Sequence, residues 1–127
     1  MTTLFELVGG SKWFADLVEH FYAGVASDPL LRPLYPEEDL AGAKERLTGF
    51  LVQYWGGPAT YSEQRGHPRL RLRHVPYRIG VAEQEAWLHH MTTALRGEND
   101  LSDDVLKQVF EYFEGASIAM INVSENS

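Results

Sequence analysis

Hydrophobic residues recur at steps of three and four in four stretches of the chain, a spacing typical of helices that bury one face. In the first stretch, from Ser11 to about Asp28, they are Phe14, Leu17, Val18, Phe21, Tyr22 and Val25. In the second, from about Asp39 to Tyr54, they are Leu40, Ala43, Leu47, Phe50, Leu51 and Tyr54. The third, from about Val81 to Arg96, has Trp87, Leu88, Met91 and Leu95, and the last, after Ser102, has Leu106, Val109, Phe110, Phe113 and Met120.

Capping and helix-stopping residues divide these stretches. Thr3 with Glu6 forms a capping-box pattern that predicts a short first helix, which the glycines at 9 and 10 end. Side chains of the capping type precede the later helices at Ser11, Asp39 and Ser102. The glycines at 56 and 57, followed by Pro58, terminate the second long helix. Residues 29–39 carry three prolines and predict a short turn of helix followed by a loop.

The stretch from Ala59 to Arg78 is predicted to be a long, irregular, basic connection. Within it, residues 69–73 alternate polar and apolar, which is a strand pattern, but no other segment offers a partner strand. One or two turns of helix that end before Pro76 are the better prediction. The chain is therefore predicted to be one all-α domain over residues 1–127.

The amino-acid composition excludes several kinds of cofactor and partner. The 127 residues include no cysteine, which excludes disulfides, iron-sulfur clusters and thiolate ligands. The net charge of −7 argues against nucleic-acid binding, and no apolar run is long enough to insert in a membrane. We expect a cytoplasmic protein.

Five of the eleven cations lie between residues 65 and 78, as Arg65, Arg69, Arg71, Arg73 and Arg78. This arginine cluster is a solvated face, a nucleic-acid patch or a clamp for carboxylates.

The five histidines form neither an HExxH motif nor a zinc site with cysteine. Four of them, His20, His67, His89 and His90, are interpreted as surface or hydrogen-bonded residues. His74 differs because Pro76 ends its helix and leaves carbonyls free to orient the imidazole. The local sequence alone does not decide whether His74 is a metal ligand or an ordinary histidine. The chain has neither a phosphate-binding glycine loop nor a serine nucleophile elbow.

Several segments together resemble the truncated globins, specifically their second group, of the actinobacterial type. They are VGG at 8–10, HFYAGVASDPLLRPLYPEEDLAGA at 20–43, RLTGFLVQYWGGP at 46–58, TYSEQRGHPRLRLRHVPYRI at 60–79 and EAWL at 85–88. The resemblance implies a shortened globin fold of two helices laid over two, with haem b, iron protoporphyrin IX, as cofactor.

The resemblance also implies roles for individual residues. The ligand on the proximal side of the haem falls on His74, and the distal hydrogen-bonding groups fall on Tyr22, Tyr35 and Trp87. Ala43 stands where many globins have a distal histidine. The remaining contacts implied for the cofactor are the apolar lining and the propionate side, namely Leu47, Phe50, Leu51, Arg46, Tyr61, Arg73 and Tyr77. Ala59 departs from the family pattern, since close relatives often have arginine there.

The function implied is binding of dioxygen, carbon monoxide, nitric oxide or similar small ligands. An alternative is a haem enzyme with peroxidase or nitric-oxide dioxygenase activity, which would need an outside reductase. A cofactor-free helical module that binds an acidic partner through the arginine cluster is the third reading. The sequence leaves the reductase and assembly into a homo-oligomer open.

Overall fold

The computed structural model describes residues 3–35, 40–66, 78–97 and 101–122, and within these ranges all regular structure is helical. In chain order the elements are α1 (Leu4–Leu7), α2 (Ser11–Val25), the 3-10 helix η1 (Arg32–Leu34), α3 (Ala41–Tyr54), α4 (Thr60–Arg65), α6 (Val81–Arg96) and α7 (Asp103–Ala119). The all-α prediction is confirmed.

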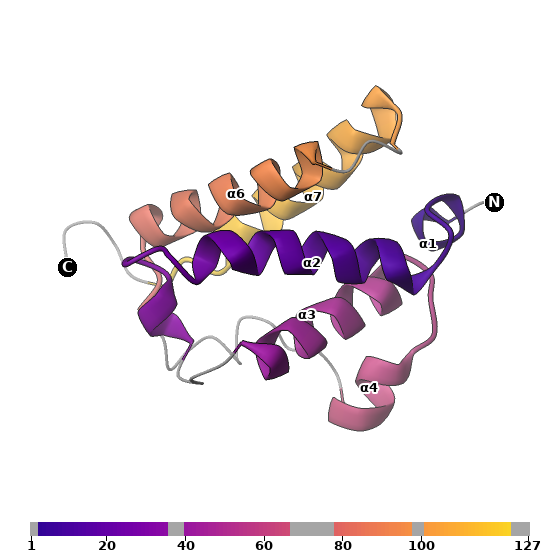
Figure 1. Cartoon of the computed structure of the whole chain (residues 1–127), viewed down its shortest axis with the longest axis horizontal. Helices are drawn as coiled ribbons and strands as arrows, with labels where there is room; N and C mark the ends of the chain where they lie inside the picture. The colour runs from indigo at the N-terminus through magenta and orange to yellow at the C-terminus, as the bar shows by residue number, and fades with distance from the viewer. Residues whose placement is uncertain (1–2, 36–39, 67–77, 98–100, 123–127) are drawn as a thin grey trace.

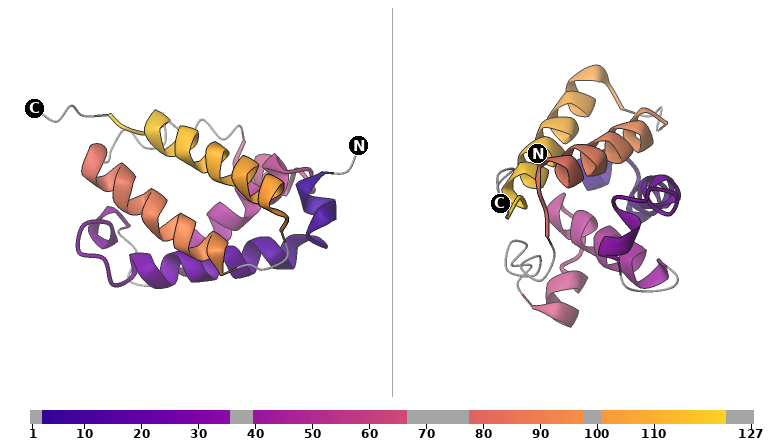
Figure 2. Two further views of the ribbon diagram at one scale, coloured as in Figure 1. Left: turned by 90° about the horizontal axis from the view of Figure 1, so that it is seen from above. Right: turned by 90° about the vertical axis from the view of Figure 1, so that its left-hand side faces the viewer.

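Helix α2 is the central element of the fold. It packs against α3 on one side and α6 on the other, while α6 packs against α7 and α4 packs on α3 (Figures 1 and 2). The pair α2 and α3 thus lies against the pair α6 and α7, which is the two-over-two arrangement that the resemblance implies.

The predicted stripe of α2 is buried at every position. Phe14, Leu17, Phe21 and Val25 have no measurable exposure, and Val18 and Tyr22 are almost as deeply buried. The helix begins directly after Gly10, whose φ of 107° lies in the region that favours glycine. Ser11 was predicted to be the cap, but it is the first helical residue and Gly10 occupies the cap position.

An aromatic cluster ties the N-terminal half of α2 to its neighbours. The Phe14 ring is stacked near Phe5 of α1, at 6.3 Å, and near Trp55 at the end of α3, at 6.1 Å. Trp55 in turn meets Phe113 of α7 edge-on at 5.6 Å. Burial of these large rings accounts for much of the hydrophobic driving force that joins the two helix pairs.

Caps set the bounds of three other helices. The Thr3 hydroxyl accepts a hydrogen bond from the Glu6 amide at 3.2 Å, and the Ser102 hydroxyl accepts one from the Val105 amide at 3.3 Å. Both predicted caps are confirmed. At the start of α6 the Gly80 amide donates to the Glu83 carboxylate at 2.9 Å. The predicted cap Asp39 lies outside the described residues.

Three further predictions about the fold need correction. The connection from Ala59 is not wholly irregular, because residues Thr60–Arg65 form α4. Tyr54 was predicted on the buried face of its helix but is 51% exposed. Met120 follows the last residue of α7 rather than lying within it. None of the helices that the structure describes has the length and apolar content needed to cross a membrane.

Candidate functional site

Three of the predicted site residues belong to one chain of aromatic contacts. Tyr22 of α2 meets Tyr35, which follows η1, edge-on with ring centroids 5.4 Å apart. Tyr22 also meets Phe21 at 4.9 Å, and Phe21 lies 5.0 Å from Trp87 of α6. The structure therefore links two phenols and an indole from three separate parts of the chain through a series of ring contacts.

The turn after α2 fixes the main chain of Tyr35. The Tyr35 amide donates to the Arg32 carbonyl at 3.1 Å, and Nη1 of Arg32 donates to the Tyr35 carbonyl at 2.7 Å. The Arg32 amide donates to the Asp28 carbonyl at 2.9 Å. Tyr35 is thus held from both sides by one residue, which is itself tied to Asp28.

The predicted apolar lining comes from α3. Ala43 and Leu51 are buried, and Leu47 and Phe50 are partly buried and pack against the core. Positions 43, 47 and 50 are three or four residues apart, so they lie on one face of the helix. This face offers apolar surface of the kind that a flat hydrophobic cofactor requires.

Two residues predicted near the propionates belong to α3 and to α4, which packs on it. Tyr61 of α4 is buried, and its ring lies 5.9 Å from Phe50. Helix α4 is held there by Gln53, which donates to the Ser62 hydroxyl at 2.7 Å and accepts from the Ser62 amide at 2.8 Å. Arg46 is partly buried on α3.

The remaining predicted site residues, His74, Arg73 and Tyr77, lie outside the described residues. The chain that follows them is anchored to the end of α7. Ile79 donates its amide to Oδ1 of Asn122 at 2.9 Å and accepts from the Asn122 amide at 2.8 Å. These two bonds fix where the chain enters α6.

A cavity of about 300 Å³ opens between α2 and the start of α3. Its walls carry Tyr22 together with the charged residues Glu19, Arg32 and Lys44. Nζ of Lys44 lies 3.1 Å from a carboxylate oxygen of Glu19, so an ion pair joins the two helices at this cavity. Among the described residues no group of three histidine, aspartate or glutamate side chains is placed to hold a metal ion.

Comparison with known proteins decides the family. The bacterial-like globin family model matches residues 3–120. Group 2 truncated hemoglobin YjbI of Bacillus subtilis is 38% identical over 116 residues, which span 91% of this chain and 86% of the relative. The chain belongs to the group II truncated haemoglobins.

Two crystal structures show the same fold. The thermostable hemoglobin of the actinobacterium Thermobifida fusca is 56% identical, with a TM-score of 0.92 over 96% of this chain and 98% of that one. The group II truncated hemoglobin of Bacillus anthracis is 36% identical, with a TM-score of 0.91 over 98% of this chain and all of that one, 100%. The architecture of this truncated haemoglobin is accordingly that of a globin.

Globins of this family bind haem b, and haem is the cofactor that the site must accommodate. The described residues fit it in two respects. The α3 face carries apolar side chains that suit a flat macrocycle, and the aromatic chain carries O–H and N–H groups that can donate hydrogen bonds.

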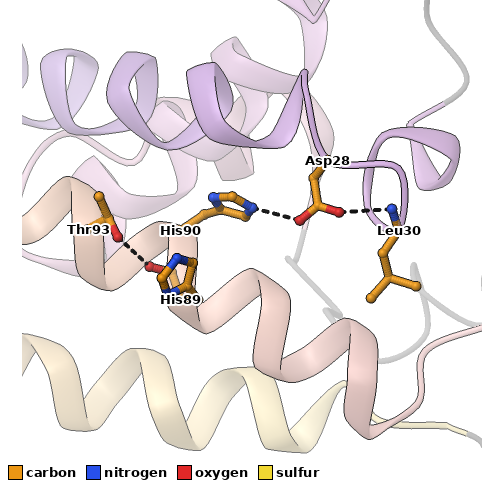
Figure 3. Close-up of polar contacts among 5 residues, drawn as sticks. All are labelled: Asp28, Leu30, His89, His90 and Thr93. Atoms are coloured by element: carbon orange, nitrogen blue, oxygen red, sulfur yellow. Dashed lines mark hydrogen bonds and ion pairs between the residues drawn. The ribbon is translucent and has the colours of Figure 1, made fainter.

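Sequence reasoning missed one polar contact beside this site. His90 of α6, interpreted only as a surface or hydrogen-bonded residue, lies with Nε2 2.7 Å from Oδ2 of Asp28 (Figure 3). Hydrogen bonds from His90 and from the Leu30 amide hold the pKa of Asp28 below its ordinary value. No spacing in the sequence signals the pair, since 62 residues separate its members.

Proposed function

We propose that this truncated haemoglobin binds dioxygen and other diatomic ligands, with His74 as the protein ligand to iron. Tyr22, Tyr35 and Trp87 are assigned as hydrogen-bond donors to the diatomic ligand. The observation that supports this most is the aromatic chain that joins the three residues through Phe21. Haem, when bound, would supply an iron atom that takes the diatomic ligand.

Each residue has a distinct task in this proposal. The phenols of Tyr22 and Tyr35 each carry one O–H and the indole of Trp87 carries one N–H, so each can donate one hydrogen bond. Leu47, Phe50 and Leu51 exclude water from the pocket. Arg46, Tyr61 and Arg73 are assigned to the haem propionates, because cations and phenols pair well with carboxylates. Tyr77 is assigned a further contact with the cofactor.

Buried donors slow the escape of a ligand that accepts their hydrogen bonds. At about 1 kcal/mol for each bond, one donor slows release about fivefold, and three slow it by about a hundredfold or more. Slow release suits tight binding or sensing of oxygen better than bulk delivery.

The character of Ala43 favours ligand binding over turnover. Ala43 is 3% exposed and has no ionisable group, so it cannot pass a proton to a bound peroxide. This is the position at which many globins carry a histidine. We therefore propose ligand binding, rather than peroxidase or nitric-oxide dioxygenase activity, as the main function.

The test is the rate of oxygen release from Tyr22→Phe, Tyr35→Phe and Trp87→Phe variants of the haem-loaded protein. Each single variant is expected to release oxygen about fivefold faster than the wild type. Tyr54→Phe is the matched control, because Tyr54 is an exposed tyrosine on α3 and its loss should leave the rate unchanged. Unchanged release in all three distal variants would overturn the proposal.

A further inference from the structure

Asp28 joins the turn after α2 to helix α6. Its Oδ2 lies 2.7 Å from Nε2 of His90, and its Oδ1 accepts a hydrogen bond from the Leu30 amide at 2.8 Å. One carboxylate therefore bridges a side chain of α6 and the main chain of the turn (Figure 3). The side chains of His90 and Asp28 are only 20% and 18% exposed, which limits competition from water.

The imidazole of His90 is fixed from a second side by α2. A Cβ atom at Gly24 would overlap Nδ1 of His90, so the bare backbone of α2 lies directly against the ring. Two titratable side chains lie near this ring, namely Asp28 and the neighbouring His89, whose ring is 5.4 Å away and exposed. His90 is thus seated between a helix backbone and a carboxylate.

Asp28 is connected to Tyr35 by a short series of hydrogen bonds. Its bond to the Leu30 amide closes a tight turn, a common use of aspartate side chains. Its carbonyl accepts from the Arg32 amide, and Arg32 holds the carbonyl and the amide of Tyr35. A displacement of the Asp28 carboxylate would therefore be passed along the turn to Tyr35.

His90 lies about one turn of α6 away from Trp87. The two residues are three positions apart in α6, so their side chains leave neighbouring points on one side of the helix. The contact between Asp28 and His90 therefore links the turn that holds Tyr35 to the helix that carries Trp87. Charge assistance strengthens this contact, because the lowered pKa keeps the Asp28 carboxylate ionised.

We propose that Asp28 and His90 are positioning residues that fix Tyr35 relative to Trp87 and thereby set how long the diatomic ligand is held. The inference rests on the proposed function, in which both residues donate hydrogen bonds to that ligand. Neither Asp28 nor His90 touches the ligand in this account.

The experiment compares His90→Phe, which keeps a ring but removes Nε2, with His90→Gln, which keeps an N–H donor. Oxygen release from the haem-loaded protein is expected to be about threefold faster in His90→Phe and near the wild-type rate in His90→Gln. The infrared C–O stretch of the carbon monoxide complex reports the distal hydrogen bonds, and it should shift in His90→Phe only. His89→Gln, an exposed change one residue away, is the matched control and should alter neither readout.

A double-mutant cycle with Tyr35→Phe separates positioning from a general loss of stability. If the pair acts through Tyr35, His90→Phe should change the release rate little once the Tyr35 hydroxyl is gone. Asp28→Ala, which removes the same contact from the other side, should reproduce the effect if His90→Phe folds poorly.

The two proposals fail in different ways. Faster release in Tyr35→Phe, with wild-type release in His90→Phe and Asp28→Ala, would overturn the positioning role alone. Additive effects of Tyr35→Phe and His90→Phe would also overturn it. Wild-type release in Tyr35→Phe itself would remove Tyr35 from the proposed function and the positioning role with it.

Discussion

The main chain of Gly24 in α2 lies directly against the imidazole ring of His90 in α6. A Cβ atom added at Gly24 would lie 3.0 Å from Cε1 and 3.1 Å from Cγ of that ring, and closer still to Nδ1. Glycine inside a helix normally costs about 1 kcal/mol relative to alanine. Here the close approach of the two helices requires it.

Gly24→Ala should therefore destabilise the protein despite its higher helix propensity. The overlap with His90 is expected to cost about 1–3 kcal/mol, which exceeds the gain in propensity and leaves a net loss of about 1 kcal/mol. Gly115→Ala in α7 is the matched control, because nothing lies within 4 Å of a Cβ there. It should stabilise the protein by about 0.5–1 kcal/mol in urea unfolding, and equal effects of the two changes would contradict the packing described.

Phe14→Ala should be among the most damaging single changes. Phe14 is 0% exposed and its ring meets Trp13, Phe5 and Trp55, so removal leaves a cavity at the junction of α1, α2 and the end of α3. The expected loss is about 3–5 kcal/mol of unfolding free energy. Leu7→Ala, at a side chain that is 58% exposed, should change it by less than about 0.5 kcal/mol. Similar losses in both variants would argue against a core at Phe14.

Tyr112 should make the free energy of unfolding fall as the pH rises through the alkaline range. Burial, and secondarily the Tyr54 phenol whose ring lies 4.3 Å away, raise the pKa of Tyr112 to about 12. This pKa is higher in the folded state than in the unfolded state. The contribution of Tyr112 to the free energy of unfolding is therefore fully present below about pH 10 and is lost as the pH rises toward 12. Tyr112→Phe should reduce the fall in the urea midpoint over this window, and should remove one late transition from the tyrosinate absorbance titration. An unchanged titration would contradict the assignment.

Asp28 should act at the acid end of the pH range. The pKa of Asp28 is lowered in the folded state, mainly by the hydrogen bond from His90 and next by the one from the Leu30 amide. The contribution of Asp28 to the free energy of unfolding is therefore present above about pH 4. The contribution is lost as the pH falls through the lowered value. Urea midpoints of the wild type and Asp28→Ala should differ at neutral pH and converge in acid. A gap that stays constant down to the lowest accessible pH would show that the charge of Asp28 is irrelevant to stability.

Strong periodicity made the long helices predictable. Every apolar position expected in α2 is buried, and α6 spans the expected residues from Val81 to Arg96. In contrast, α4 is short and is held by tertiary contacts, through Gln53 with Ser62 and Tyr61 with Phe50. Such contacts leave no periodic signal, so the helix was missed.

The site was predictable only through resemblance. Composition and spacing do not decide whether His74 is a metal ligand. The family pattern, in contrast, points to Tyr22, Tyr35 and Trp87. The structure places Tyr22 beside Tyr35 and links it to Trp87 through Phe21. The contact between Asp28 and His90 is set by how α2 packs on α6, a relationship that a single sequence does not encode locally. The roles assigned to all of these site residues stay predictions, and His74, Arg73 and Tyr77 also lie outside the described residues.

The most direct test of the account is the iron–histidine stretching band in the resonance Raman spectrum of the ferrous, ligand-free protein. The band should be present in the wild type and in His89→Ala, and absent in His74→Ala. Its survival unchanged in His74→Ala would contradict the account, because another side chain would then hold the iron.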